Sequence, residues 1–128
     1  MRKVNVAVVG VTGAVGEVML EILESRDFPV DTLYPLASAR SAGKSLQFRG
    51  KRHVVQDLSE FDFSQTPIAL FSAGGDISAE FAPIAAAAGC VVIDNTSHFR
   101  RDDDVPLVIP EVNPQAISHY VNRSIIAN

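Results

Sequence analysis

Hydrophobic and polar positions along the chain follow the pattern of an α/β protein. Short apolar runs that predict buried strands occur at residues 3–9, 32–38, 68–71, 90–93, 107–109 and 124–127. Helical periodicity is present at 14–26 and 77–88, and Asn113-Pro114 predicts the start of a short helix. Because strands and helices alternate, we predict an α/β fold: a Rossmann-type, doubly wound, mostly parallel sheet with helices on both faces.

Three local features add detail to this prediction. Residues 46–48 and 53–55 flank a polar turn and predict a small hairpin. Pro83 indicates the start of a second helix within 77–88 rather than a kink. The apolar side chains expected to face the sheet from the helix at 14–26 are Val15, Val18, Met19, Ile22 and Leu23.

A glycine-rich loop joins the first predicted strand to the first predicted helix. Its spacing, G-x-x-G-x-x-G, has one residue more between the first two glycines than the dinucleotide fingerprint G-x-G-x-x-G. A strand, a glycine-rich turn and a helix present backbone N–H groups and a helix N-terminus to a pyrophosphate. The predicted cofactor contacts in this loop are Gly10, Thr12, Gly13, Ala14, Val15 and Gly16.

Three further predicted strands also end in small or polar residues. In open α/β sheets, ligands bind beyond the carboxyl ends of the strands, so we expect these loops to meet the glycine loop in one cofactor trough. The candidate contacts in them are Ser38, Arg40, Ser41, Ser72, Ala73, Gly74 and Asn95.

The end of the second strand bears on the choice of cofactor. NAD-specific domains usually place Asp or Glu there to bind the ribose 2′-hydroxyl. This chain has Ser38-Ala39-Arg40-Ser41 instead, so no carboxylate would repel a 2′-phosphate and Arg40 is suited to bind one. We therefore predict NADP as the cofactor, against the alternative of a solvated polar loop.

Composition narrows the class of protein. The 128 residues predict one domain, and a net charge of -4 argues against nucleic acid or a membrane surface as partner. No apolar run has the length of a membrane span and no secretory leader is recognisable, so we expect a cytoplasmic protein. The single cysteine, Cys90, is expected to be a core residue, and the three histidines show no metal-ligand spacing, so we predict no metal site.

Arg100 and Arg101 allow two interpretations. Arginine binds phosphate or carboxylate in a bidentate manner, and both residues follow a predicted strand end. The alternative is that both are surface charges balanced by the acidic run 102–104.

Several motifs, taken together, resemble the N-terminal part of the bacterial aspartate-β-semialdehyde dehydrogenases. They occur in the family's order and span nearly the whole chain. Val11 stands where the family more often has Ala. The matching segments are 8–16, 37–44, 70–75, 94–100 and 108–114.

The resemblance implies an enzymatic activity, and it assigns a ligand group to several residues. The family reduces L-aspartyl-4-phosphate with NADPH to L-aspartate semialdehyde and phosphate, in lysine, threonine and methionine biosynthesis, through a cysteine nucleophile. The resemblance further implies that residues 12–15 hold the pyrophosphate and that Ser38, Arg40 and Ser41 bind the 2′-phosphate. It also implies that Arg100 binds the substrate phosphate. The parent enzyme is expected to be a homodimer or homotetramer.

One departure from the family limits these expectations. The family's nucleophile follows the stretch that matches 125–128, in an Asn-Pro-Asn-Cys context, and Cys90 does not match it. We therefore expect residues 1–128 to be an NADP-binding Rossmann domain with no catalytic residue and no substrate or dimerisation domain, inactive alone. The alternatives are an N-acetylglutamyl-phosphate reductase-like domain, a non-catalytic relative of the dehydrogenase, a generic NADP-binding module and a nucleotide-free structural role.

Overall fold

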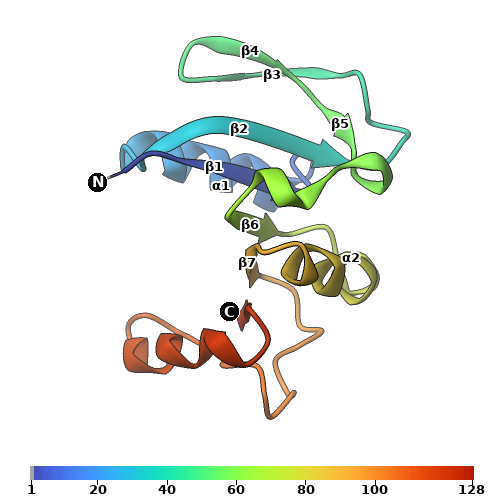
Figure 1. Ribbon diagram of the computed structural model, residues 1–128. Coiled ribbons are helices and arrows are strands. Elements are labelled where there is room, and N and C mark those ends of the chain that lie inside the picture. The colour runs from blue at the N-terminus through green and yellow to red at the C-terminus, as the bar shows by residue number, and fades with distance from the viewer. Residues whose placement is uncertain (1) are drawn as a thin grey trace.

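A six-stranded sheet, in which every pair of neighbours is parallel, organises the computed structural model, which describes residues 2–128. Its strand order is β5-β2-β1-β6-β7-β8, which is the order 3-2-1-4-5-6 of doubly wound dinucleotide-binding folds (Figure 1). The strands are β1 (Val4–Val9), β2 (Val30–Ala37), β5 (Gln56–Asp57), β6 (Ile68–Phe71), β7 (Val91–Asp94) and β8 (Ile125–Ala127).

Two α-helices cover opposite faces of this sheet, as predicted. Along β1, Val6 and Val8 pack in one hydrophobic cluster with side chains of α1 (Ala14–Ser25). Ala7 and Val9 point to the other face and pack in a second cluster with side chains of α2 (Gly75–Ala87). This alternation is the two-residue period of a strand buried on both faces. Residues 2–128 also contain three 3-10 helices: η1 (Leu58–Glu60), η2 (Phe63–Gln65) and η3 (Pro114–Asn122).

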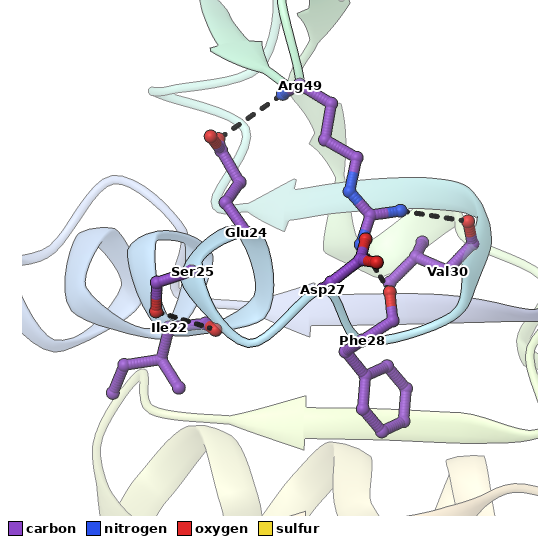
Figure 2. Close-up of polar contacts among 7 residues, drawn as sticks. All are labelled: Ile22, Glu24, Ser25, Asp27, Phe28, Val30 and Arg49. Carbon is purple, nitrogen blue, oxygen red and sulfur yellow. Dashed lines mark hydrogen bonds and ion pairs between the residues drawn. The ribbon is translucent and has the colours of Figure 1, made fainter.

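The predicted hairpin is present as the antiparallel pair β3 (Ser45–Phe48) and β4 (Lys51–Val54). Arg49 and Gly50 form its turn with φ of 53° and 75°, as in the tight turns that join two strands. Arg49 also ties the hairpin to the last turn of α1, the start of β2 and the segment between them (Figure 2). Its guanidinium donates to the carbonyls of Val30 and Phe28, and its backbone N–H donates to the Glu24 carboxylate.

The buried face of α1 agrees with the predicted one at Leu23 and, in part, at Met19, but differs at three other positions. Val15, Val18 and Ile22 are 47%, 49% and 47% exposed. The residues of α1 that are buried are Gly16, Leu20 and Leu23, which lie at helical spacing on one face. Gly16 selects this face, because its backbone packs directly against Gly10 and leaves no room for a side chain.

The effect of Pro83 also differs from the prediction, because Pro83 lies inside one continuous helix, α2. A proline at this position removes the N–H that would reach the carbonyl of Ala79. Both residues are exposed, so water can satisfy that carbonyl and the helix continues.

The predicted strand at 107–109 is reduced to a single bridge between Leu107 and Ala127. The side chain of Asn113 folds back on this segment, where it accepts from the Ile109 N–H at 2.8 Å and donates to the Leu107 carbonyl at 2.8 Å. Asn113 therefore bonds to backbone groups that a longer strand would offer to a neighbouring strand. Its side chain caps no N–H of η3.

Across residues 2–128, no helix is both long and apolar enough to cross a membrane.

Candidate functional site

The glycine loop turns sharply between β1 and α1. Gly10 has φ of +88°, and a Cβ built on it would lie 2.9 Å from Ala73. A Cβ on Gly16 would lie 2.2 Å from the carbonyl oxygen of Gly10. These two glycines are therefore required by the fold, since they let α1 and the loop after β6 approach the end of β1.

Gly13, the middle glycine, has a different role. Its φ is -86°, and a Cβ there would meet only the Gly10 oxygen at 3.5 Å, so the fold itself tolerates a side chain. Gly13 is the N-cap residue of α1 and makes no side-chain cap. The first turn of α1 therefore offers its N–H groups and the positive end of its dipole to a ligand.

A cleft of about 330 Å³ lies over this loop at the carboxyl ends of β1, β2 and β6. No acidic side chain lines it, and the hydroxyl of Ser72 donates back to the Val9 carbonyl at 3.2 Å, which ties β6 to β1. An uncharged cleft beside a helix N-terminus suits an anionic ligand. The lining residues are Gly10, Thr12, Gly13, Ala37, Ser38, Leu58, Ser72, Ala73 and Ile77.

The cleft unites only part of the predicted cofactor contacts. Leu58 from η1 and Ile77 from α2 form apolar walls that the sequence analysis missed, because only the tertiary fold brings them to the strand ends. The predicted contacts that do not line the cleft are Ala14, Val15, Gly16, Arg40, Ser41, Gly74 and Asn95.

The loop after β2 is a tight turn beside the cleft. The carbonyl of Ser38 accepts from the backbone N–H groups of Ser41 and Ala42, at 2.9 and 3.0 Å. Arg40 projects from this turn, exposed, and has no hydrogen bond or ion pair within residues 2–128. On the α1 side of the glycine loop, Lys44 and Thr12 line a second hollow of about 270 Å³. Arg40 is therefore a cation without a carboxylate partner in residues 2–128, whereas Lys44 shares its hollow with Glu17.

A second polar assembly, which we call the arginine corner, lies at the ends of β7 and β8 and comprises Asp94, Asn95, Arg100 and Asn128. Asp94 is fully buried, and its carboxylate accepts from the Ser78 hydroxyl at 2.8 Å. It also accepts from the N–H and hydroxyl of Thr96, at 3.0 and 2.9 Å. The carboxylate therefore fixes the loop after β7 against α2.

The Arg100 guanidinium is oriented by main-chain oxygens. Its Nε donates to Asn128 at 3.0 Å and its Nη2 donates to Asn95 at 3.2 Å. Asp102 and Asp104 of the acidic run pair instead with Arg123, at 3.3 and 3.5 Å. In the part of the chain described, Arg100 thus has no acidic partner, which argues against the interpretation that it merely balances this run.

Cys90 is a core residue, as expected. Its Sγ is fully buried and lies 2.7 Å from the Thr66 carbonyl oxygen and 3.1 Å from that of Phe63. Burial raises the pKa of the Cys90 thiol, so the nucleophilic thiolate is disfavoured. Residues 2–128 contain no cluster of three or more His, Cys, Asp or Glu side chains that could hold a metal ion.

Comparison with known proteins identifies the family. A family model described as semialdehyde dehydrogenase, NAD binding domain, matches residues 5–120. The chain belongs to this family. Aspartate-semialdehyde dehydrogenase 2 of Vibrio cholerae is 65% identical over 127 residues, which are 99% of this chain and 38% of that relative. The chain thus spans about two-fifths of the length of the curated relatives it matches.

Solved structures of relatives share the fold closely. The crystal structure of aspartate semialdehyde dehydrogenase II complexed with ASA from Vibrio cholerae superposes with a TM-score of 0.97 at 64% identity, covering 99% of this chain and 42% of that one. The aspartate semialdehyde dehydrogenase with NADP from Candida albicans has a TM-score of 0.81 at 26% identity, covering 98% of this chain and 42% of that one. These relatives favour the dehydrogenases over the reductase alternative.

Proposed function

We propose that this chain is the NADP-binding domain of an aspartate-semialdehyde dehydrogenase. The observation that carries the proposal is the cleft at the carboxyl ends of β1, β2 and β6. The glycine loop that leads into α1 borders this cleft, and no acidic side chain lines it. In this proposal the backbone of the loop from Gly10 to Gly16 receives the pyrophosphate, by way of Thr12, Gly13, Ala14 and Val15. The loop after β6, at Ser72, Ala73 and Gly74, and Asn95 after β7 border the rest of the cofactor.

The preference for NADP over NAD rests on the turn after β2. Ser38, Arg40 and Ser41 follow that strand without a carboxylate, and Arg40 is exposed and unpaired in the described chain. A guanidinium and two hydroxyls suit a phosphate monoester. The NADP named for the Candida albicans relative supports the same choice.

The parent protein, we infer, reduces L-aspartyl-4-phosphate to L-aspartate semialdehyde and phosphate. NADPH, when bound, supplies the hydride. Arg100 would hold the substrate phosphate, since the corner orients its charge without neutralising it. The family's cysteine nucleophile has no counterpart within residues 1–128, so we expect this chain alone to be inactive. The proposal includes a cytoplasmic parent that assembles as a homodimer or homotetramer.

Calorimetric titration of the chain with NADP, and separately with NAD, tests the cofactor assignment. We expect clear binding of NADP and a weaker or undetectable response to NAD. Equal affinities would contradict the role of the β2 turn. Binding of neither, with the fold verified by circular dichroism, would show that the cleft alone is not a cofactor site. In the parent gene, a codon for cysteine soon after Asn128 separates an enzyme from a non-catalytic relative.

Substitution of Arg40 by alanine tests the residue on which the specificity rests. A hydrogen bond to a charged group contributes about 1.5–3 kcal/mol, so Arg40→Ala should weaken NADP roughly 10- to 150-fold and leave NAD almost unchanged. Arg52→Ala, which removes an exposed arginine from β4, is the matched control and should leave both affinities unchanged. Equal losses for NADP and NAD would refute the assignment.

A further inference from the structure

Asn128 uses all four of its hydrogen-bonding groups, and each reaches a different partner. Its N–H donates to the Asp94 carbonyl at 3.0 Å, and its main-chain oxygen accepts from Arg100 Nε at 3.0 Å. Its Oδ1 accepts from the Asn95 side chain at 3.2 Å, and its Nδ2 donates to the Val108 carbonyl at 2.8 Å. One residue thus connects the end of β7, the loop after it, the segment at Val108 and the guanidinium.

We propose that Asn128 is a positioning residue that holds Arg100 ready for the substrate phosphate. This inference rests on the proposed function, because it takes phosphate to be the ligand of Arg100. Asn128 anchors Nε and Asn95 anchors Nη2, which fixes the plane of the guanidinium. Nη1 has no partner in residues 2–128 and remains for an anion, which arginine binds best through two parallel hydrogen bonds.

The chemical identity of the anchors matters as much as their geometry. Both oxygens that hold Arg100 belong to main-chain groups, so in the longer parent chain they are neutral carbonyls. A carboxylate in their place would orient the guanidinium equally well but would cancel the charge that attracts phosphate. The corner therefore gives Arg100 a fixed direction and leaves it a full positive charge.

The asparagine side chain adds two hydrogen bonds to the one that the N–H of residue 128 makes with the Asp94 carbonyl. Its amide is both donor and acceptor, and it bonds Val108 on one side and Asn95 on the other. Alanine loses both bonds. Aspartate keeps the acceptor but turns the donor into an oxygen that faces the Val108 carbonyl, which is repulsive. Either change should allow the main-chain oxygen, and Arg100 with it, to move.

Asn113 provides a matched control. It too is an asparagine that bonds backbone groups of the same segment, at Leu107 and Ile109, through both side-chain atoms. Within residues 2–128 it makes no hydrogen bond with Arg100. If Asn128 only stabilises this segment, then Asn113→Ala and Asn128→Ala should have the same consequences.

The experiment uses the full-length parent enzyme and measures KM for inorganic phosphate in the direction that consumes aspartate semialdehyde and NADP. Asn128→Ala should raise this KM roughly tenfold, because an Arg100 guanidinium that is no longer held in place contributes much less to phosphate binding. KM for NADP should stay the same. Arg100→Ala should raise KM for phosphate further, and the double variant should equal Arg100→Ala, since Asn128 acts only through Arg100. Asn113→Ala should lower the melting temperature without changing KM.

Three results would overturn the proposal. In the double variant, the increases in KM for phosphate of the two single variants could multiply. In Asn128→Ala, KM for NADP could rise as much as KM for phosphate, or KM for phosphate could equal that of Asn113→Ala. If Asn128→Ala does not fold, Asn128→Asp enters the same cycle with the same expectations. The proposed function fails in different ways. A wild-type parent without activity, or an active Arg100→Ala enzyme with unchanged KM for phosphate, would refute the function or the role of Arg100 before any Asn128 variant is considered.

Discussion

The glycine loop and the arginine corner both lie at the carboxyl ends of parallel strands, but they are built from different parts of the chain. The loop is a single stretch from Gly10 to Gly16, and it presents backbone N–H groups where side chains are absent. The corner joins side chains from α2, from the loop after β7 and from the end of β8. The loop depends on the absence of side chains, whereas the corner depends on side-chain hydrogen bonds that leave only part of the Arg100 guanidinium without a partner in residues 2–128.

This difference decides which substitutions each region tolerates. In the loop, the harmful change is an added atom, because the backbone of two elements is already in contact. In the corner, the harmful change is a removed atom, because Asp94 is fully buried and its partners would lose their acceptor. We therefore expect enlarged side chains to destabilise the glycine loop and truncated side chains to destabilise the arginine corner.

The largest effect is expected from Gly16→Ala. Its Cβ would lie 2.2 Å from the Gly10 oxygen and 2.8 Å from Val11 Cα, so α1 must move away from the loop. Forced overpacking against backbone should lower the free energy of unfolding by about 3 kcal/mol or more. NADP binding should be lost with it. Urea denaturation and calorimetry measure the two effects.

Gly13→Ala is the control within the same loop. Its Cβ would meet only one atom, at 3.5 Å, and its φ of -86° suits alanine. Stability should change by less than about 0.5 kcal/mol, while NADP binding should weaken if the pyrophosphate approaches this backbone. Equal destabilisation by the two variants would show that crowding at Gly10 is not the cause.

An intermediate effect is expected from Asp94→Ala in the corner. The change leaves the Ser78 hydroxyl and the Thr96 N–H without their acceptor, and each unsatisfied buried group costs about 1–3 kcal/mol. We expect a loss of about 2 kcal/mol in the free energy of unfolding, measured by urea denaturation. Asp94→Asn keeps an acceptor for both groups and should cost less than half as much. Equal losses would mean that the charge, rather than the hydrogen bonds, holds the loop.

The smallest effect is expected from Thr12→Val. Thr12 lines the cleft, but its hydroxyl has no hydrogen bond in the described chain, and valine has nearly the same shape. If the loop binds through its backbone, NADP affinity should change less than about threefold, a fraction of the 1.4 kcal/mol that a tenfold change represents. A tenfold loss in calorimetry would show that a side chain contributes, and the contrast between loop and corner would be weaker than stated.

The same contrast explains what the sequence could predict. The strand, loop and first helix were predicted correctly because the signal is local: an apolar run, spaced glycines and helical periodicity within about 20 residues. The buried face of α1 was predicted wrongly at Val15, Val18 and Ile22. Both faces carry apolar side chains, Leu20 and Leu23 being on the buried one, so apolar character alone could not choose between them. The close backbone contact of Gly16 with Gly10 favours the buried face, and only the fold reveals it.

Two of the four corner residues, Asn95 and Arg100, were predicted as site residues, and the other two were missed. Arg100 was singled out as an arginine after a predicted strand end, and the family resemblance then assigned it the substrate phosphate. Asp94 and Asn128 were not singled out, although Asp94 ends one apolar strand and Asn128 directly follows another. The rule of polar residues at strand ends was applied to the strand before Asn95 without including Asp94, and it was not applied to the strand that Asn128 follows. Strand β5 left no such signal, because Gln56 and Asp57 are polar and pair with β2 through their backbone.

Cys90 gives the chain a use as its own reporter. Its thiol is fully buried, is held neutral by a raised pKa, and is the single sulfhydryl among 128 residues. An alkylating reagent can therefore react with the native protein only when the core opens. The rate at which the protein gains the mass of one reagent molecule then measures how often the core opens, with no engineered label. In the longer parent, a fast-reacting cysteine would be seen as a separate, earlier phase of alkylation.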